Sequence, residues 1–482
     1  MADHLLRIGG DRVAGADGTY PITNPATEEL VGEAPQASTA QAADAAQAAR
    51  DAFDSWSRTP PEERGALLDR VADLIERDTA ELIELTIDET GGTRRTVESI
   101  QVPHAAARFR RYARGALEPT LDPLPPSVTA AGALGPASVT NAYAQRLPVG
   151  VVTAITSYNF PLVNMAGKLG PALAAGNTVV VKPAPQDPLG VLRLVDLCHE
   201  AGIPPGVVNS ITTTETAPAE VLTTDRNVDM VSFTGSTVVG QRIAQAGGAT
   251  MKRLLLELGG KGACIVFDDA DLGAATSAIA SVWGFHAGQI CTAPTRVIAH
   301  RSIHDQLVEN LTAIPAFLSV GDPRDAATLV GPLVSGVQRD RVLGHIQGGV
   351  DSGATLAVGG DTPDRKGFYV NPTLFTGCTN DMPISREEIF GPVVVVIPFD
   401  DEDEAVAIAN DSEYGLYDYL FTNTARAHAL APRLRCGNVG VNTIGRNPET
   451  PFGGFKQSGI GRDGGSYGLA AYRELQSVVW PS

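Results

Sequence analysis

Several features that mark other protein classes are missing from this sequence of 482 residues. No apolar run approaches the roughly 18 residues of a membrane span. The first residues, MADHLLRIGGDRVAG, lack the basic segment and apolar core of a signal peptide. The five cysteines are scattered, odd in number and form no CxxC pair, which argues against a disulfide framework and a zinc cluster. The sequence therefore predicts a cytoplasmic protein with no membrane segment and no bound metal.

Positive charge is also scarce. Lys and Arg number 37 against 55 Asp and Glu, which gives a formal net charge of −18. This balance argues against a general nucleic-acid binder or a protein of anionic membranes. An anionic cofactor is still compatible, because one Lys and a few backbone amides can hold it locally. The 43% hydrophobic and 19% charged residues are typical of a globular chain, and its length predicts two or three domains.

The order of apolar patterns predicts an α/β fold. Residues 40–58 are Ala-rich, and residues 61–91 begin with a proline and acidic residues suited to a helix start, so each stretch predicts an amphipathic surface helix. Residues 119–146 contain two segments of alternating pattern that are separated by Pro and Gly. This pattern fits an extended hairpin or a loose linker equally well. From Val149, short β-branched runs alternate with helical stretches, which predicts a doubly wound parallel sheet. After Gly259 the alternation resumes and indicates a second α/β unit.

Three polar residues in this pattern are candidates for chemistry. Cys291 lies in GFHAGQICTAPTR among small residues and amides, although a lone Cys is more often a buried hydrophobe. Glu257 follows three leucines in LLLELGGKG, where an apolar setting favours a general base; a solvated strand end is the alternative. The 34 residues between them suffice for one strand and one helix to return to the same edge. Asn159, between a strand and a helix start, is a candidate oxyanion donor or an ordinary turn residue.

Other segments have the composition of a nucleotide site. Lys182 ends an almost wholly apolar strand, where it can meet a ribose or phosphate or extend to solvent. At Thr234, Gly235 and Ser236 a strand meets a helix, with Ser236 as the predicted N-cap, which would present backbone amides to a phosphate. The stretch is not GxGxxG, so the usual dinucleotide fingerprint is absent.

Two further stretches stand out near the C-terminus. EEIFGPVVVV (387–396) places two carboxylates before a turn and a strand, which suits a ribose diol or an acidic loop. PFGGFKQSGIGRDGG (451–465) is rich in glycine and too aromatic for a disordered tail.

Taken in order, these segments resemble the aldehyde dehydrogenase superfamily from residue 24 to the C-terminus. The segments are YNFPL, GPALAAGNTVVVKP, FTGSTVVG, LELGGK, GQICTA, EEIFGPVV and PFGGFKQSGIGR. The resemblance implies a dinucleotide-binding domain (1–118 and 147–257), a catalytic α/β domain (258–450) and a small oligomerisation arm of strands (119–146 and 466–482). It also implies a homodimer or homotetramer.

The resemblance further implies the roles of particular residues. Cys291 would attack the aldehyde, Asn159 would hold the oxyanion, Glu257 would activate water, and Lys168 would assist a proton path. NAD or NADP would be the cofactor, and no metal is implied. The cofactor would contact Lys182, Thr234, Gly235, Ser236, Glu388 and Phe390.

The sequence departs from the family pattern at four positions. Tyr158 stands where Trp is common, Asp463 replaces a more usual Glu, and His286 replaces an amide and is expected to shape its loop. In KPAPQD, Pro185 stands where many NAD-specific relatives carry the Glu that accepts from the ribose 2′-hydroxyl, so NADP use is open. The KPxP pattern resembles benzaldehyde and vanillin dehydrogenases, which points to aromatic aldehydes.

Three rival functions remain open from the sequence. A coenzyme A-acylating relative would generally lack the general base, so Glu257 argues for hydrolysis. A non-catalytic relative would not be expected to keep Cys291, Asn159 and Glu257 together. A semialdehyde dehydrogenase would need an Arg in its substrate funnel, and Arg446 is one candidate.

Overall fold

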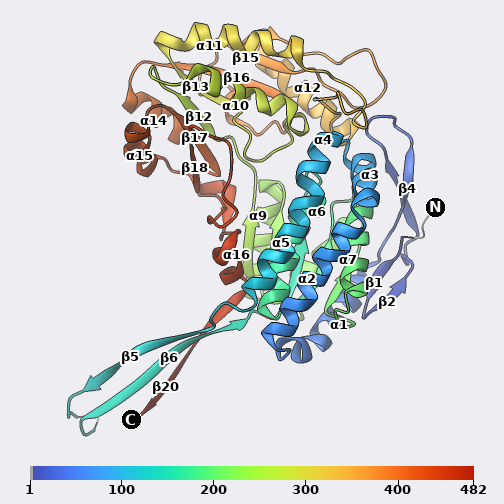
Figure 1. Ribbon diagram of the computed structural model, residues 1–482, viewed down its shortest axis with the longest axis vertical. Coiled ribbons are helices and arrows are strands. Elements are labelled where there is room, and N and C mark those ends of the chain that lie inside the picture. The colour runs from blue at the N-terminus through green and yellow to red at the C-terminus, as the bar shows by residue number, and fades with distance from the viewer. Residues whose placement is uncertain (1–3, 134, 482) are drawn as a thin grey trace.

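Two mostly parallel sheets and one long antiparallel ribbon form the framework of the protein (Figure 1). The structure is a computed structural model that describes residues 4–133 and 135–481. The first sheet has eight strands in the order β19-β11-β10-β7-β8-β9-β1-β2. Their bounds are β1 Leu6–Ile8, β2 Asp11–Val13, β7 Val151–Ile155, β8 Thr178–Lys182, β9 Val208–Ser210, β10 Met230–Thr234, β11 Arg253–Glu257 and β19 Gly459–Ile460.

The five central strands of this sheet run parallel, as the alternating pattern predicts. β7 and β8 are buried along their whole length, which explains their unbroken β-branched sequences. The helices around this sheet are α1 Thr39–Ser57, α2 Pro61–Arg77, α3 Thr79–Thr90, α4 Arg94–Thr96, α5 Val102–Gly115, α6 Pro161–Ala175, α7 Leu189–Glu200, α8 Thr216–Thr224 and α9 Thr237–Gly248. Directly after β2 in the chain, β3 Thr19–Thr23 and β4 Leu30–Pro35 form a separate two-stranded antiparallel sheet.

The prediction of one helix over 61–91 is wrong. The helix is broken at Asp78, which separates α2 from α3 and has φ −94° and ψ 17°. Its carboxylate binds Arg77 (Nε–Oδ1 2.6 Å) and also Arg193 of α7. The Thr79 hydroxyl donates back to the carbonyl oxygen of Ile75 at 3.2 Å. The Thr79 bond to a backbone carbonyl is of the kind that offers the chain an alternative to a continuous helix.

The second sheet has seven strands in the order β14-β15-β16-β13-β12-β17-β18. They are β12 Ala263–Val266, β13 Arg296–His300, β14 Thr355–Val358, β15 Thr373–Thr376, β16 Val393–Phe399, β17 Tyr417–Phe421 and β18 Asn438–Val441. The helices of this part are α10 Leu272–Gly284, α11 Arg301–Ala313, α12 Gly336–Asp351, α13 Pro383–Arg386, α14 Glu402–Asn410 and α15 Thr424–Leu430. The second α/β unit expected after Gly259 is therefore present, and the predicted α/β fold class is confirmed.

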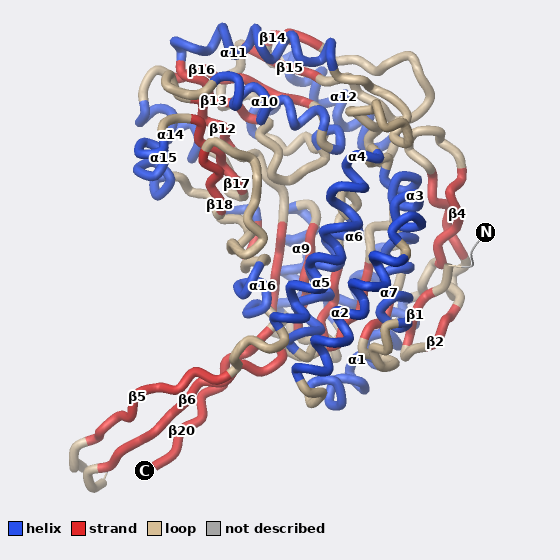
Figure 2. Tube along the Cα trace, in the orientation of Figure 1, coloured by secondary structure: helices blue, strands red, loops and turns tan. Residues whose placement is uncertain are grey.

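Residues 119–146 form a hairpin and not a loose linker. β5 (Leu121–Thr129) and β6 (Ser138–Pro148) pair antiparallel, and β20 (Arg473–Pro481) pairs with the other edge of β6. Figure 2 shows this ribbon projecting from the body, with the C-terminus near its tip. The short helix α16 (Gly465–Ala471) precedes β20 and packs on α5 and α6. Among the described helices, none combines the length and the hydropathy that a membrane crossing needs.

Candidate active site

A cavity of about 1430 Å³ lies where the carboxyl ends of β7, β8, β10 and β11 meet the second sheet. Ligands bind beyond the carboxyl ends of strands in such folds, so this is the expected place for a site. The structure brings nine of the predicted site residues into its wall. They are Asn159, Lys182, Thr234, Gly235, Ser236, Glu257, Cys291, Glu388 and Phe390.

Cys291 lies in the loop between α10 and β13. It is partly exposed to the cavity, whereas the other four cysteines are buried. The preceding turn contains His286 and Ala287 in the left-handed region, with φ 52° and 49°, which agrees with a loop-shaping role for the histidine. Burial raises the pKa of the Cys291 thiol to about 11, and the positive charge of Arg446 opposes that rise. The thiol is therefore the resting form near neutral pH.

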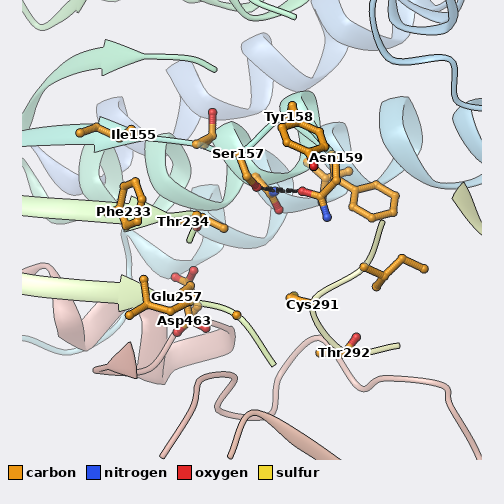
Figure 3. A pocket seen from close by; sticks show the side chains of 18 of the residues that line it. Ile155, Ser157, Tyr158, Asn159, Phe233, Thr234, Glu257, Cys291, Thr292 and Asp463 are labelled. Atoms are coloured by element: carbon orange, nitrogen blue, oxygen red, sulfur yellow. Dashed lines mark hydrogen bonds between the residues drawn. The ribbon is translucent and has the colours of Figure 1, made fainter. Parts of the chain in front are cut away.

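Asn159 is fixed by hydrogen bonds on both sides of its amide. Its Nδ2 donates to the Gln289 carbonyl oxygen at 2.8 Å, and its Oδ1 accepts from the Ser157 hydroxyl at 2.8 Å. The Gln289 carbonyl belongs to the loop that carries Cys291, so this bond ties the amide to that loop. Figure 3 shows the amide nitrogen on the Cys291 side of the pocket. The second Nδ2 hydrogen has no acceptor among the described residues and is available to a ligand.

Glu257 ends β11 and is only 5% exposed, yet neither carboxylate oxygen has a hydrogen-bond partner among the described residues. Burial raises its pKa well above the ordinary value, and the nearby Asp463 carboxylate adds to the rise. The glycine-rich stretch makes this approach possible: a Cβ at Gly453 would lie 2.7 Å from Oε1 of Glu257. Figure 3 shows Glu257 and Asp463 side by side. A carboxyl group of this kind is a strong base once it is ionised.

Lys168 lies behind the cavity and not in its wall. Its Nζ donates to the Ser232 hydroxyl at 3.0 Å, and that hydroxyl lies 2.8 Å from the Tyr472 hydroxyl. Burial lowers the pKa of Lys168, while the charges of Asp463 and Glu257 oppose this change. The lysine therefore acts on Glu257 through its charge, because no hydrogen bond joins the two side chains within the described chain.

The phosphate part of the predicted cofactor site is the start of α9. Ser236 occupies the N-cap position as predicted, but its hydroxyl accepts no hydrogen bond from the helix. The hydroxyl thus remains available to a ligand. Gly235 allows the chain to turn closely here, since a Cβ would lie 2.4 Å from the Phe233 ring. Free amides at a helix start suit a phosphate group.

The ribose contacts predicted for Lys182 and Glu388 also face the cavity. Lys182 is buried, and among the described residues its Nζ donates only to the Pro183 carbonyl oxygen, at 3.1 Å. Burial lowers its pKa to about 8. Glu388 accepts one bond from the Gly260 amide at 3.0 Å, and burial raises its pKa to about 7. Spare donors and acceptors at these positions fit the ribose hydroxyls and phosphates of a nicotinamide dinucleotide. No cluster of three potential metal ligands occurs within residues 4–133 and 135–481.

The family model described as the aldehyde dehydrogenase family matches residues 13–478. This chain belongs to that family. It is an NAD(P)-dependent aldehyde dehydrogenase. Its sequence is 38% identical to a betaine aldehyde dehydrogenase of Rhizobium etli over 479 residues, covering 98% of this chain and 96% of the relative. An aldehyde dehydrogenase of Emericella nidulans is 38% identical over 481 residues, covering 98% and 94%.

Solved structures of the family have the same fold. The NAD+ complex of the aldehyde dehydrogenase from Bacillus cereus superimposes with a TM-score of 0.93 at 37% identity, covering 100% of this chain and 97% of that one. The presence of NAD+ in that complex agrees with the donor and acceptor set of the present dehydrogenase.

Several residues of the cavity have no clear signal in the sequence of this dehydrogenase. Helix α5 places His104, Arg108 and Arg111 in the wall, and their spacing of four and three residues is the only pattern that could have indicated a shared face. Arg446 also lines the cavity and donates to the Thr292 hydroxyl. The sequence named Arg446 as a candidate without placing it; the structure places it beside the catalytic-cysteine candidate.

Proposed function

We propose that this enzyme oxidises its aldehyde to a free carboxylic acid, with Cys291 as the nucleophile and Glu257 as the base that activates water. The observation that carries the proposal is the buried, unbonded carboxyl group of Glu257 in the wall of the same cavity as Cys291. An acyl transfer to coenzyme A would not need such a base. The test is to incubate enzyme, benzaldehyde and NAD without coenzyme A and to measure reduced cofactor and benzoate.

The first step is attack of the Cys291 sulfur on the aldehyde carbon. The thiol gives its proton to water in the cavity, and the Arg446 charge lowers the cost of the thiolate. A carbon–sulfur bond forms and the carbonyl electron pair moves to oxygen. The Asn159 amide and the Cys291 backbone N–H are the proposed donors to this oxyanion. When bound, the nicotinamide ring supplies the hydride acceptor.

The second step is hydrolysis of the thioester left on Cys291. Glu257 takes a proton from water as the water oxygen attacks the thioester carbon. The carbon–sulfur bond then breaks, and the sulfur leaves with the bonding electrons. The positive charge of Lys168 favours the ionised carboxylate and is proposed to help Glu257 release its proton again, whereas the charge of Asp463 opposes that release.

An aromatic aldehyde is the proposed substrate class. The support is the cavity wall on the Cys291 side, which contains the rings of Phe160, Phe285, Tyr417, Tyr419 and Phe452. Flat rings in the wall favour a flat substrate through stacked or edge contacts. Comparing kcat/KM for benzaldehyde and a short aliphatic aldehyde tests this class.

For the cofactor, we propose that NADP is accepted beside NAD. Pro185 lines the cavity and carries no charge that would repel a 2′-phosphate. Initial rates with each cofactor, at one aldehyde concentration, test this proposal.

The domain plan and assembly are also proposals. We assign dinucleotide binding to residues 1–118 and 147–257, catalysis to 258–450, and assembly into a homodimer or homotetramer to the arm of 119–146 and 466–482. Exposed Leu475, Val479 and Trp480 on the edge strand β20 support an interface there, since an edge strand with exposed apolar side chains seldom stays uncovered. The free cysteines support a cytoplasmic location.

A further inference from the structure

Several arginines line the cavity, although the whole protein carries a net charge of −18. Helix α5 contributes Arg108, Arg111 and Arg114 to the wall, and the loop after β18 contributes Arg446. The carboxyl groups of Glu257, Glu449 and Asp463 line the same cavity. A protein with this overall charge would repel an anionic small molecule unless local cations reversed the field.

Two of these arginines have structural roles. Arg111 forms ion pairs with Glu118 at 3.0 Å and with Glu449 at 2.6 Å. Arg114 lies in the last turn of α5, where a cation is favoured by the helix dipole. Arg108 and Arg446 have no such role. No carboxylate forms an ion pair with either of them within residues 4–133 and 135–481, and neither lies in the last turn of a helix.

Arg446 is held so that its guanidinium borders the reacting centre. One of its N–H groups donates to the hydroxyl of Thr292, the residue after Cys291. Its guanidinium carbon lies 4.5 Å from the centre of the Phe452 ring and 5.7 Å from that of Tyr417. These contacts fix the plane of the group at little entropic cost and leave most of its five N–H donors unused.

We propose that the aldehyde substrate carries a carboxylate, which binds Arg446, with Arg108 as a second positive charge in the cavity wall. This inference rests on the proposed function and narrows its substrate class. A guanidinium is the side chain best matched to a carboxylate, because its parallel N–H groups bind both oxygens. The alternative is that Arg446 serves only to favour the Cys291 thiolate, which would help charged and neutral aldehydes equally.

Matched pairs of aldehydes separate these two roles. The pairs are 4-carboxybenzaldehyde with benzaldehyde, and succinic semialdehyde with butanal. For each pair, the ratio of kcat/KM for the charged to the neutral aldehyde is measured in the wild type, in Arg446→Gln and in the control Arg114→Gln. We expect the wild type to prefer the charged member of at least one pair. A preference within the benzaldehyde pair indicates a carboxylate on an aromatic ring, and a preference within the butanal pair indicates a carboxylate on an aliphatic chain.

Arg446→Gln should lower that ratio by about 10- to 100-fold, the usual value of a hydrogen bond to a charged group. Arg114→Gln removes the same charge from the same wall and should leave the ratio unchanged. Arg446→Lys should restore part of the preference, since it keeps the charge and loses the paired geometry. An equal loss for charged and neutral aldehydes in Arg446→Gln would overturn the proposal, and so would a wild-type preference for the neutral members.

Binding of terephthalate, measured by calorimetry, gives a readout that needs no turnover. Binding that is lost in Arg446→Gln supports the carboxylate site even if none of the four aldehydes is oxidised; in that case the proposed function fails and this site stands. Equal binding of terephthalate to the wild type and to Arg446→Gln overturns the site, whatever the aldehyde rates are.

Discussion

Glu257→Gln should trap the enzyme as its thioester. The amide has the shape of the carboxyl group, and no hydrogen bond is broken, because neither carboxylate oxygen has a partner in the described structure. Attack by Cys291 and loss of the hydride do not need this carboxylate, so each active site should reduce one cofactor in a rapid burst. The following steady-state rate should fall by about 10²- to 10⁴-fold, the usual contribution of a general base. Stopped-flow absorbance and the mass of the acylated protein measure the two effects.

The same variant should change how stability depends on pH. Burial, followed by the charge of Asp463, raises the pKa of Glu257 above its ordinary value. The folded protein therefore holds this proton more tightly than the unfolded chain, and wild-type stability falls as pH rises from the unfolded pKa towards the folded one. Glu257→Gln removes that fall. Its midpoint of thermal unfolding should match the wild type near pH 4 to 5 and exceed it at about pH 8 to 9.

A matched control is Glu413→Gln, which changes an exposed carboxylate outside the cavity wall. It should alter neither the steady-state rate nor the pH profile of stability. Equal steady-state rates in Glu257→Gln and the wild type would refute the assignment of the base. A burst slowed as much as the steady state would show that Glu257 already acts during attack, and the two-step division of roles would be wrong.

Three further predictions concern other parts of the molecule. Cys291→Ala should abolish both burst and turnover, whereas Cys198→Ala, in the core of the first α/β unit, should keep turnover; activity in the first variant would exclude Cys291 as nucleophile. Pro185→Glu should lower kcat/KM for NADP about tenfold more than for NAD, because a carboxylate near a 2′-phosphate costs at least about 1.4 kcal/mol, and an unchanged cofactor ratio would remove the argument. Val479→Asp, on the exposed face of β20, should shift the elution in gel filtration towards the monomer; an unchanged profile would exclude this strand from the interface.

The strand ends explain how much of this site could be predicted from the sequence. Asn159, Lys182, Thr234 and Glu257 each end or follow a short apolar run, and the carboxyl ends of parallel strands share one edge of a sheet. The local pattern and the topology rule together place these residues in one cavity. The resemblance to known sequences supplied the roles of these residues and of Cys291, and it alone named Lys168.

What the pattern could not predict depends on contacts between distant segments. Thr292 and Arg446 are 154 residues apart, and the sequence pattern does not predict their hydrogen bond. Asp78, at the break between α2 and α3, pairs with Arg193, which lies 115 residues further along the chain. The apolar periodicity of 61–91 continues through Asp78, so periodicity alone predicts one continuous helix in place of α2 and α3.

The glycine-rich stretch shows why the base itself is costly to the fold. Gly453 and Gly459 let a backbone without side chains cover Glu257 and β11, since a Cβ at Gly459 would lie 1.9 Å from the Leu256 carbonyl oxygen. This cover buries the carboxylate and offers it no donor, and burial raises its pKa. Donors at this position would stabilise the ionised carboxylate and weaken it as a base. The missing hydrogen bonds thus make Glu257 able to take a proton from water. They also make the folded protein less stable when Glu257 is charged. The kinetic and the thermal effects of Glu257→Gln should therefore appear together.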